Sequence, residues 1–191
     1  MGAPGELMGD DINSKVVTWA HGKLGQQVGR GECWDLIDRA LRSAGARSST
    51  TTGRNDDYVW GRLARLDEVV PGDVLQFRNF VVTTRIDRVV RFPDGRIRPD
   101  MVETVARRPH HSAIVYHVDG GGEIRVYEQH VKPSGNRVQD HVVATRNVAP
   151  TPKVTHELVD SGGGHLSTAT VETTTTVTVS GIVWAYHPEA N

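Results

Sequence analysis

Residues 26–41, QQVGRGECWDLIDRAL, hold the only cysteine of the 191-residue chain, Cys33, and this stretch decides the expected fold. From Cys33 onward, apolar residues recur at three- and four-residue steps until Gly45 follows. This spacing predicts an amphipathic helix over 33–44 that ends at the glycine. Cys33 then lies in the first turn, where unpaired backbone N–H groups and the helix dipole favour a thiolate. The adjacent Glu32 opposes this effect, because a neighbouring negative charge disfavours the thiolate form.

The rest of the chain predicts one more helix before this stretch and an antiparallel sheet after it. Asp10 or Asp11 can cap a helix over 12–24, where apolar residues recur at helical spacing. Turn signals rich in Gly, Pro and Asp then occur at 71–73, 93–95 and 119–122. They separate short runs of residues that favour β-strands. The Thr-rich segment 167–180 contains Val and lacks Pro, which favours a half-exposed strand. Helices followed by an antiparallel sheet indicate the α+β class.

Composition excludes several classes of function. The net charge of −1 lacks the basic footprint that is typical of nucleic-acid binding, so we expect no nucleic-acid partner. A single cysteine excludes an internal disulfide and every zinc site built on paired cysteines. The first residues show no basic stretch followed by an apolar core, and no apolar run reaches membrane-spanning length. The sequence leaves the location unknown: we expect a cytoplasmic protein by default, or an extracellular or cell-wall protein if it is delivered by another route. We expect no membrane span and no cofactor, and the sequence predicts no oligomeric state.

A cysteine nucleophile needs a base and a group that orients the base. Histidine and carboxylate side chains lie on the hairpin around 119–122. If Val118 pairs with Glu123, His111 and Glu128 become diagonal neighbours on one face of the sheet, because strand side chains alternate with period two. The same pairing sets His130 opposite His111. The hairpin therefore predicts His111 as general base, with Glu128 or His130 as the orienting residue.

Two further assignments complete the candidate site. Gln27 lies six residues before Cys33 on a loop that must turn back toward the helix, so its amide is a candidate donor to an oxyanion. His110 replaces His111 as the base if the strand register slips by one residue, because such a slip moves every side chain to the other face. Glu128 is preferred to His130 as the third member, and both remain candidates.

Five motifs resemble the CHAP (cysteine, histidine-dependent amidohydrolase/peptidase) group of papain-like bacterial cell-wall hydrolases. They are VVTWAHGKLG, GECWDLIDRAL, PGDVLQF, HHSAIVYHVDGGGEIRVYEQH and GIVWAYHP, and together they cover a little under a third of the chain. Two positions depart from the group's pattern. His130 stands where the group typically has asparagine, and Glu32 stands where it usually has glutamine.

The resemblance implies a fold and an activity. The implied fold is α+β and papain-like, with N-terminal helices packed on an antiparallel β-sheet. The chain would form one domain over 1–191, with insertions at about 78–108 and 132–180. The implied activity is that of a cysteine peptidase or amidase, a thiol-dependent hydrolase of amide bonds, with peptidoglycan or a peptide amide as substrate.

Other hypotheses remain open. A papain-like hydrolase of γ-glutamyl or protein amides would use the same residues. The histidines and the glutamate of the hairpin, His110, His111, His117, Glu128 and His130, also suggest a metal site, although a metal site leaves the cysteine helix unexplained. The third alternative is a binding module without catalysis, in which Cys33 is a buried apolar residue.

Overall fold

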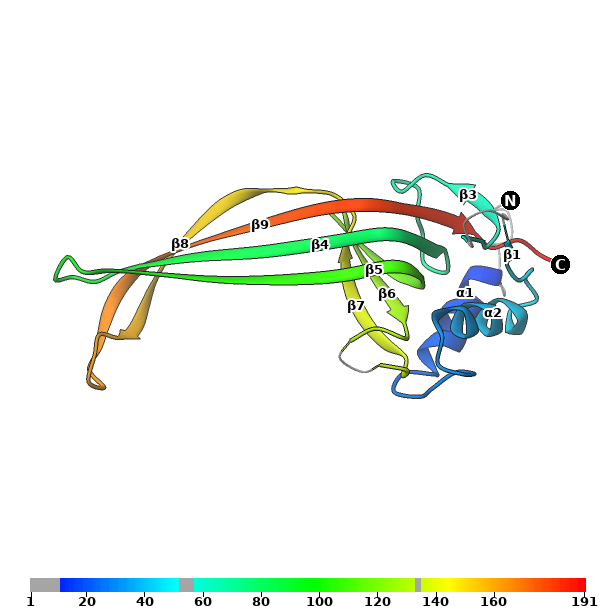
Figure 1. Cartoon of the computed structure of the whole chain (residues 1–191), viewed down its shortest axis with the longest axis horizontal. Coiled ribbons are helices and arrows are strands. Elements are labelled where there is room, and N and C mark those ends of the chain that lie inside the picture. The colour runs from blue at the N-terminus through cyan, green and yellow to red at the C-terminus, as the bar shows by residue number, and fades with distance from the viewer. Residues whose placement is uncertain (1–10, 52–56, 133–134) are drawn as a thin grey trace, which may run out of the picture. The chain divides into compact units, whose positions relative to one another are not determined.

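The computed structural model describes residues 11–51, 57–132 and 135–191 (Figure 1). Of the described residues, 58% lie in strands and 12% in helices. The helices are α1 (Ile12–His21) and α2 (Cys33–Ser43). The strands are β1 (Thr50–Thr51), β2 (Tyr58–Val59), β3 (Arg62–Ala64), β4 (Val74–Arg91), β5 (Ile97–Gly120), β6 (Glu123–Glu128), β7 (Gln139–Ala144), β8 (Val148–Asp160) and β9 (Leu166–His187).

The expected fold class is wrong. The structure is mostly antiparallel β-sheet with two short helices in its described part, not the expected α+β, papain-like arrangement of N-terminal helices packed on an antiparallel β-sheet. The reason lies in the stretches expected as insertions. They continue the strands, so that β4, β5 and β9 reach 18, 24 and 22 residues.

The chain folds into two compact units. The first is drawn from residues 1–80, 108–145 and 181–191, and the second comprises 81–107 and 146–180. The second unit thus falls within the ranges expected as insertions. The expectation of one domain over 1–191 stays a prediction.

In the main sheet of the described residues, neighbouring strands follow the order β3-β9-β4-β5-β6-β7, and β8 pairs with β9 (Figure 1). The predicted pairing of Val118 with Glu123 is wrong, because Val118 pairs with Ile124. One register shift between His117 and Val115 then brings Val115 opposite Val126, as the same prediction requires. The register that matters for the site is therefore correct, although the turn is not.

Both N-terminal helices form as predicted and bury one face in the first unit. The Asp11 carboxylate caps α1 by accepting from Ser14 N at 2.6 Å, while Asp10 lies outside the described residues. Helix α1 ends at His21, earlier than expected, because Leu24 instead bridges to Val138. The apolar stripe of α2 is fully buried at Leu36, Ile37, Ala40 and Leu41.

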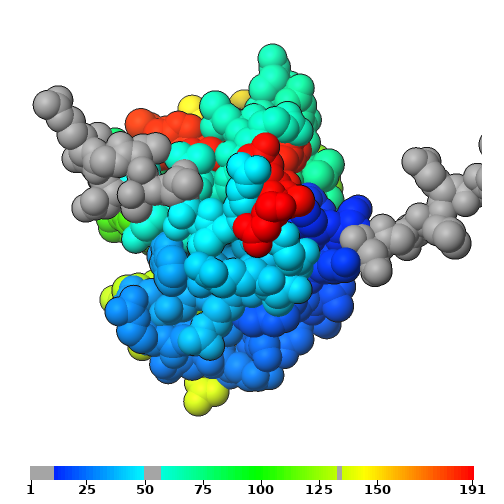
Figure 2. Space-filling model, turned by 90° about the vertical axis from the view of Figure 1, so that its right-hand side faces the viewer, coloured from blue at the N-terminus to red at the C-terminus, as the bar shows by residue number. Residues whose placement is uncertain are grey.

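The C-terminal residues of the first unit meet the segment that directly follows α2. Arg47 N donates to Glu189 O at 2.8 Å, and Asn191 N donates to Gly45 O at 3.2 Å. Figure 2 shows this face, where the cyan segment that follows α2 lies against the red C-terminal residues.

The second unit has a small core of its own, formed by Val90, Phe92, Val159, Ala169 and Val171. The Thr-rich segment 167–180 is strand, as predicted, and pairs with β8 in antiparallel register. Within the described residues, no helix is long and apolar enough to cross a membrane.

Candidate active site

The loop before α2 is folded around Asp35, the third residue of that helix. The Asp35 carboxylate accepts hydrogen bonds from Arg30 N at 2.8 Å and Glu32 N at 3.4 Å. Gly29 has φ +59°, and a Cβ there would lie 2.6 Å from Asp35 Cγ, so the position needs glycine. These contacts fix the chain direction at the helix start and place Cys33 there with 7% of its surface exposed.

Gln129 is a second anchor of this loop, and the sequence did not single it out. Its buried side-chain amide bonds both backbone groups of Val28, accepting from N at 3.1 Å and donating to O at 3.0 Å. It also donates to Glu32 O at 2.5 Å. Gln129 directly follows the candidate acid Glu128, and this position was the only sequence signal that could have pointed to a role near the site.

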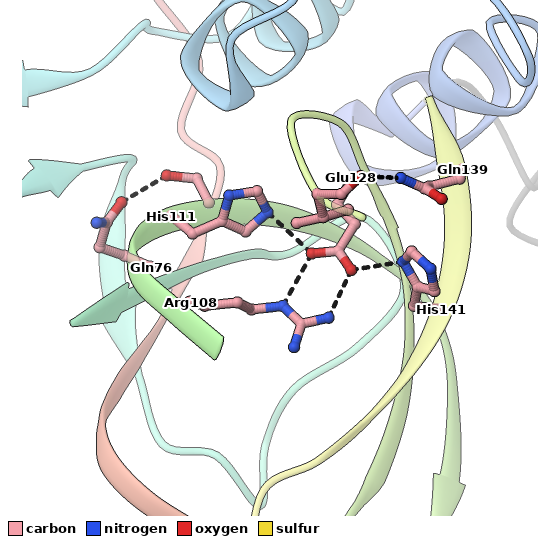
Figure 3. Close-up of polar contacts among 8 residues, drawn as sticks. Gln76, Arg108, His111, Glu128, Gln139 and His141 are labelled. Carbon is pink, nitrogen blue, oxygen red and sulfur yellow. Dashed lines mark hydrogen bonds and ion pairs between the residues drawn. The ribbon is translucent and has the colours of Figure 1, made fainter. Parts of the chain in front are cut away.

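His111 joins the thiol to the acid. Its Nε2 lies 2.8 Å from Glu128 Oε2 (Figure 3). Cys33 lies close enough to the same imidazole to raise its pKa. Because Nε2 is used by Glu128, Nδ1 is the nitrogen left for the thiol. Burial disfavours the imidazolium, but the hydrogen bonds to Cys33 and Glu128, with their charges, outweigh it and raise the pKa of His111 to about 9. The arrangement therefore favours a protonated His111 near neutral pH.

The strand that carries His111 is anchored by a buried polar network at the next residue. Ser112 Oγ donates to Gln76 Oε1 at 2.5 Å, and Trp60 Nε1 donates to the same oxygen at 3.2 Å. All three side chains are fully buried. This network fixes β5 to β4 beside the imidazole, so that His111 has little freedom to shift along the sheet.

Glu128 is fully buried and accepts four hydrogen bonds from three side chains (Figure 3). Besides His111, Arg108 donates from Nε to Oε2 at 2.9 Å and from Nη2 to Oε1 at 2.5 Å. His141 Nδ1 lies 2.7 Å from Oε1. Burial raises the pKa of this carboxyl, but the hydrogen bonds from His111, His141 and Arg108 hold it well below its usual range. The carboxylate is thus ionised and fixed in orientation.

The other predicted site residues lie elsewhere. Gln27 is exposed and donates to Gly29 O at 3.3 Å, so the described contacts do not join its side chain to Cys33. His130 lies with Nδ1 2.9 Å from Glu32 Oε2, and that ion pair is about half exposed. His110 approaches Asp57 at 3.8 Å rather than Glu128. The catalytic roles of all the predicted residues, including Cys33, His111 and Glu128, stay predictions.

A pocket of about 470 Å³ opens beside the thiol. It is lined by Arg30, Glu32, Cys33, Trp34, Tyr58, His110 and His130. Aromatic and charged side chains thus share its walls. In the part of the chain that the structure describes, no cluster of three or more His, Cys, Asp or Glu could hold a metal ion.

Sequence reasoning also missed Arg108 and His141. Arg108 stands three residues before His111, and strict alternation along a strand would put the two on opposite faces. His141 reaches Glu128 because β7 pairs with β6, where His141 is opposite Val126. The expectation that 132–180 is an insertion hid that pairing.

Comparison with known proteins identifies the relatives of the chain. Over 86 residues it is 34% identical to Altered inheritance of mitochondria protein 3 from the yeast Debaryomyces hansenii, an alignment that covers 37% of this chain and 9% of that protein. No solved structure matches. These comparisons agree with a papain-like, cysteine proteinase fold and give no support to the CHAP group or to a peptidoglycan substrate. Residues 6–147 match the family described as the AIM3/BBC1 cysteine proteinase-fold domain, and the chain belongs to this family.

Proposed function

We propose that this domain is a thiol-dependent hydrolase of amide bonds in peptides or proteins. The observation that carries the proposal is the arrangement of Cys33, His111 and Glu128: a thiol at a helix start interacts with an imidazole that is hydrogen-bonded to a buried carboxylate. A nucleophile, a base and an orienting group are the three parts that acyl transfer by cysteine requires.

The geometry supports a defined division of roles. Cys33 Sγ, as thiolate, attacks the amide carbonyl and forms the S–C bond. The imidazolium of His111 then protonates the leaving amine from Nδ1 as the C–N bond breaks. A water molecule, deprotonated by His111, hydrolyses the thioester and restores the thiol. Glu128 holds His111 through Nε2 in all of these steps.

The oxyanion of the tetrahedral intermediate needs donors close to the thiol. The backbone N–H of Cys33 lies at the start of α2, where helix geometry provides no intrahelical acceptor for it. Gln27 remains a predicted second donor, and its side chain would have to leave Gly29 O to serve.

The pocket favours peptide or protein amides over small apolar substrates. Its aromatic walls, Trp34 and Tyr58, provide apolar contact area, while Arg30 and the Glu32–His130 pair provide charged groups at the same opening. Extended polar chains carry both kinds of group. We do not propose peptidoglycan as the substrate, because no comparison supports it.

Incubation with a peptide library tests the proposal, with products read by mass spectrometry. We expect wild type to cleave a subset of the peptides and Cys33→Ala to cleave none. His111→Gln should lose at least about a hundredfold in rate, because general acid–base catalysis contributes on that order. His117→Gln is the matched control, since His117 lies on the same strand but is largely exposed and paired with Asp119.

A binding module without catalysis is the competing function, and 7% exposure of Cys33 favours it. Iodoacetamide at mildly acidic pH separates the two. Alkylation of Cys33 faster than that of free cysteine, and slowed by His111→Gln, supports the enzyme. Alkylation no faster than free cysteine and unaffected by His111→Gln, together with an uncut library, would overturn it.

A further inference from the structure

The acceptor positions of Glu128 are completely used. Oε2 accepts from His111 and from Arg108 Nε, while Oε1 accepts from Arg108 Nη2 and from His141. An ionised carboxylate offers about four such positions. Of the four bonds, only one reaches the imidazole that faces the thiol, and the other three serve only to hold the carboxylate.

The protonation state of Glu128 decides which tautomer His111 adopts. As a carboxylate, Glu128 accepts from Nε2–H and leaves Nδ1 free to take the proton of Cys33. A protonated Glu128 would instead donate to Nε2, and neutral His111 would then carry its hydrogen on Nδ1, toward the thiol. That tautomer cannot accept the thiol proton, and a wrong tautomer of this kind costs several orders of magnitude in serine proteases.

Burial pushes Glu128 toward the protonated form, because an isolated carboxylate is poorly stabilised away from water. Glu128 is fully buried, and the Arg108 side chain is 7% exposed. Arg108 therefore supplies a permanent positive charge in the interior. His141 is 28% exposed and completes the set from the more buried face of β7.

We propose that Arg108 and His141 are positioning residues of this site, which keep Glu128 ionised and aimed at His111 and thereby enforce the His111 tautomer that accepts the thiol proton. The inference rests on the proposed function and adds to it two residues that touch neither the thiol nor the pocket lining. Among the described residues, the charged or titratable groups that hydrogen-bond to Glu128 are Arg108, His111 and His141. Cys33 interacts with His111 and raises its pKa.

The packing around Arg108 agrees with a role in orientation. Its guanidinium lies 5.5 Å from the centroid of the Phe77 ring, and the same ring stacks against His111 at 6.2 Å with an interplanar angle of 28°. Phe77 is fully buried. One rigid aromatic ring thus sets the relative position of the cation and the imidazole on either side of Glu128.

The test follows the state of His111 and the reactivity of Cys33 without any substrate. Wild type and variants labelled with ¹⁵N-histidine are titrated from pH 5 to 9 by NMR, and iodoacetamide alkylation of Cys33 is timed over the same range. The disruptive variants are Arg108→Met and His141→Phe. The conservative variants are Arg108→Lys, which keeps the charge, and His141→Gln, which keeps a donor.

Arg125→Met and His117→Phe are matched controls. Both residues lie on the same hairpin, and both pair with Asp119 far less buried than Glu128 is. Near-uniform ¹H–¹⁵N spectra across the variants establish that each one folds.

We expect Arg108→Met to lower the pKa of His111 from about 9 by at least one unit. That shift reduces the protonated fraction of His111 at pH 9 from about one half to about one tenth, so alkylation of Cys33 at pH 9 should slow about fivefold. In the same variant neutral His111 should carry its hydrogen on Nδ1. His141→Phe should act in the same direction but more weakly, and Arg108→Lys and His141→Gln should stay close to wild type, as should both controls.

An unchanged or raised pKa of His111 in folded Arg108→Met would overturn the proposal, and so would equal effects in the control variants. If Arg108→Met does not fold, His141→Phe compared with His141→Gln decides the question by the same readouts. Because neither readout uses a substrate, a protein that cleaves no peptide refutes the proposed function and leaves this test fully readable.

Discussion

The Arg108–Glu128 ion pair should show strong energetic coupling between its two side chains. The pair is bidentate, at 2.9 and 2.5 Å, and its side chains are only 7% and 0% exposed. Removing one partner of such a pair leaves a buried charge without compensation, which typically costs about 3–5 kcal/mol of unfolding free energy. Removing both leaves no orphan charge.

The expected magnitudes follow from the contacts that remain. Glu128→Gln leaves the buried charge of Arg108 without a counter-charge and weakens the hydrogen bonds to two histidines as well. We therefore expect it to lower the free energy of unfolding by about 5 kcal/mol. Arg108→Gln leaves Glu128 hydrogen-bonded to His111 and His141, so we expect it to lower the free energy of unfolding by about 3 kcal/mol. The double variant should cost about as much as Glu128→Gln alone, which gives a coupling of about 3 kcal/mol by a double-mutant cycle.

Urea denaturation at pH 7 and 25 °C measures all four proteins of the cycle. The native pKa of Glu128 is depressed below its ordinary 4.5, so its stabilising contribution is fully present above pH 4.5 and is lost as the pH falls through the lowered value. The cycle at pH 7 thus samples the whole ion pair. Additive single effects, within about 0.5 kcal/mol, would refute the reasoning, because they would mean that the two charges are solvated independently.

Two further predictions concern the loop before α2. Gly29→Ala should lose more stability in urea than Gly25→Ala, by about 1 kcal/mol or more: both alanines pay the cost of positive φ, but only the first meets Asp35, and equal losses would contradict that contact. Glu32→Gln should speed alkylation of Cys33 at pH 6.5 by no more than about fivefold, because exposed charges interact by about 1 kcal/mol or less, and a larger change would place Glu32 directly against the thiol.

The helices were predictable because burial imposes a clear period on their sequence. The apolar steps after Cys33 match α2 to within one residue, and Asp11 caps α1 as its type suggests. The pairing of Val115 with Val126 was predictable for a related reason, since both residues are fully buried and a slip would expose them.

The fold class was not predictable from the same signals. Along 97–107 every residue of β5 is exposed, so neither face carries the alternating apolar pattern that marks a half-buried strand. These stretches were therefore expected as insertions in a smaller domain, although the turn at 93–95 and the Thr-rich segment 167–180 did predict strands within them. Strand pairing, rather than burial of side chains, keeps them extended.

The supporting half of the site was hidden by irregular geometry. Arg108 and His111 differ by an odd number of positions, yet both bond Glu128. A regular strand would separate them, so no period-based reading could join them. His141 depends on the pairing of β6 with β7, which short-range patterns do not encode.

The charges of Glu32 and Glu128 are compensated in different ways. Glu32 was the residue in the sequence that most opposed a thiolate, and the structure sets His130 against it at 2.9 Å, with both side chains about half exposed. Glu128 is neutralised instead by a buried guanidinium. Salt screens the exposed pair but hardly reaches the buried one, so ionic strength should alter the environment of Cys33 while leaving the hold of Glu128 on His111 intact. A change in salt concentration alone should therefore distinguish the contribution of the exposed Glu32–His130 pair from that of the buried Arg108–Glu128 pair.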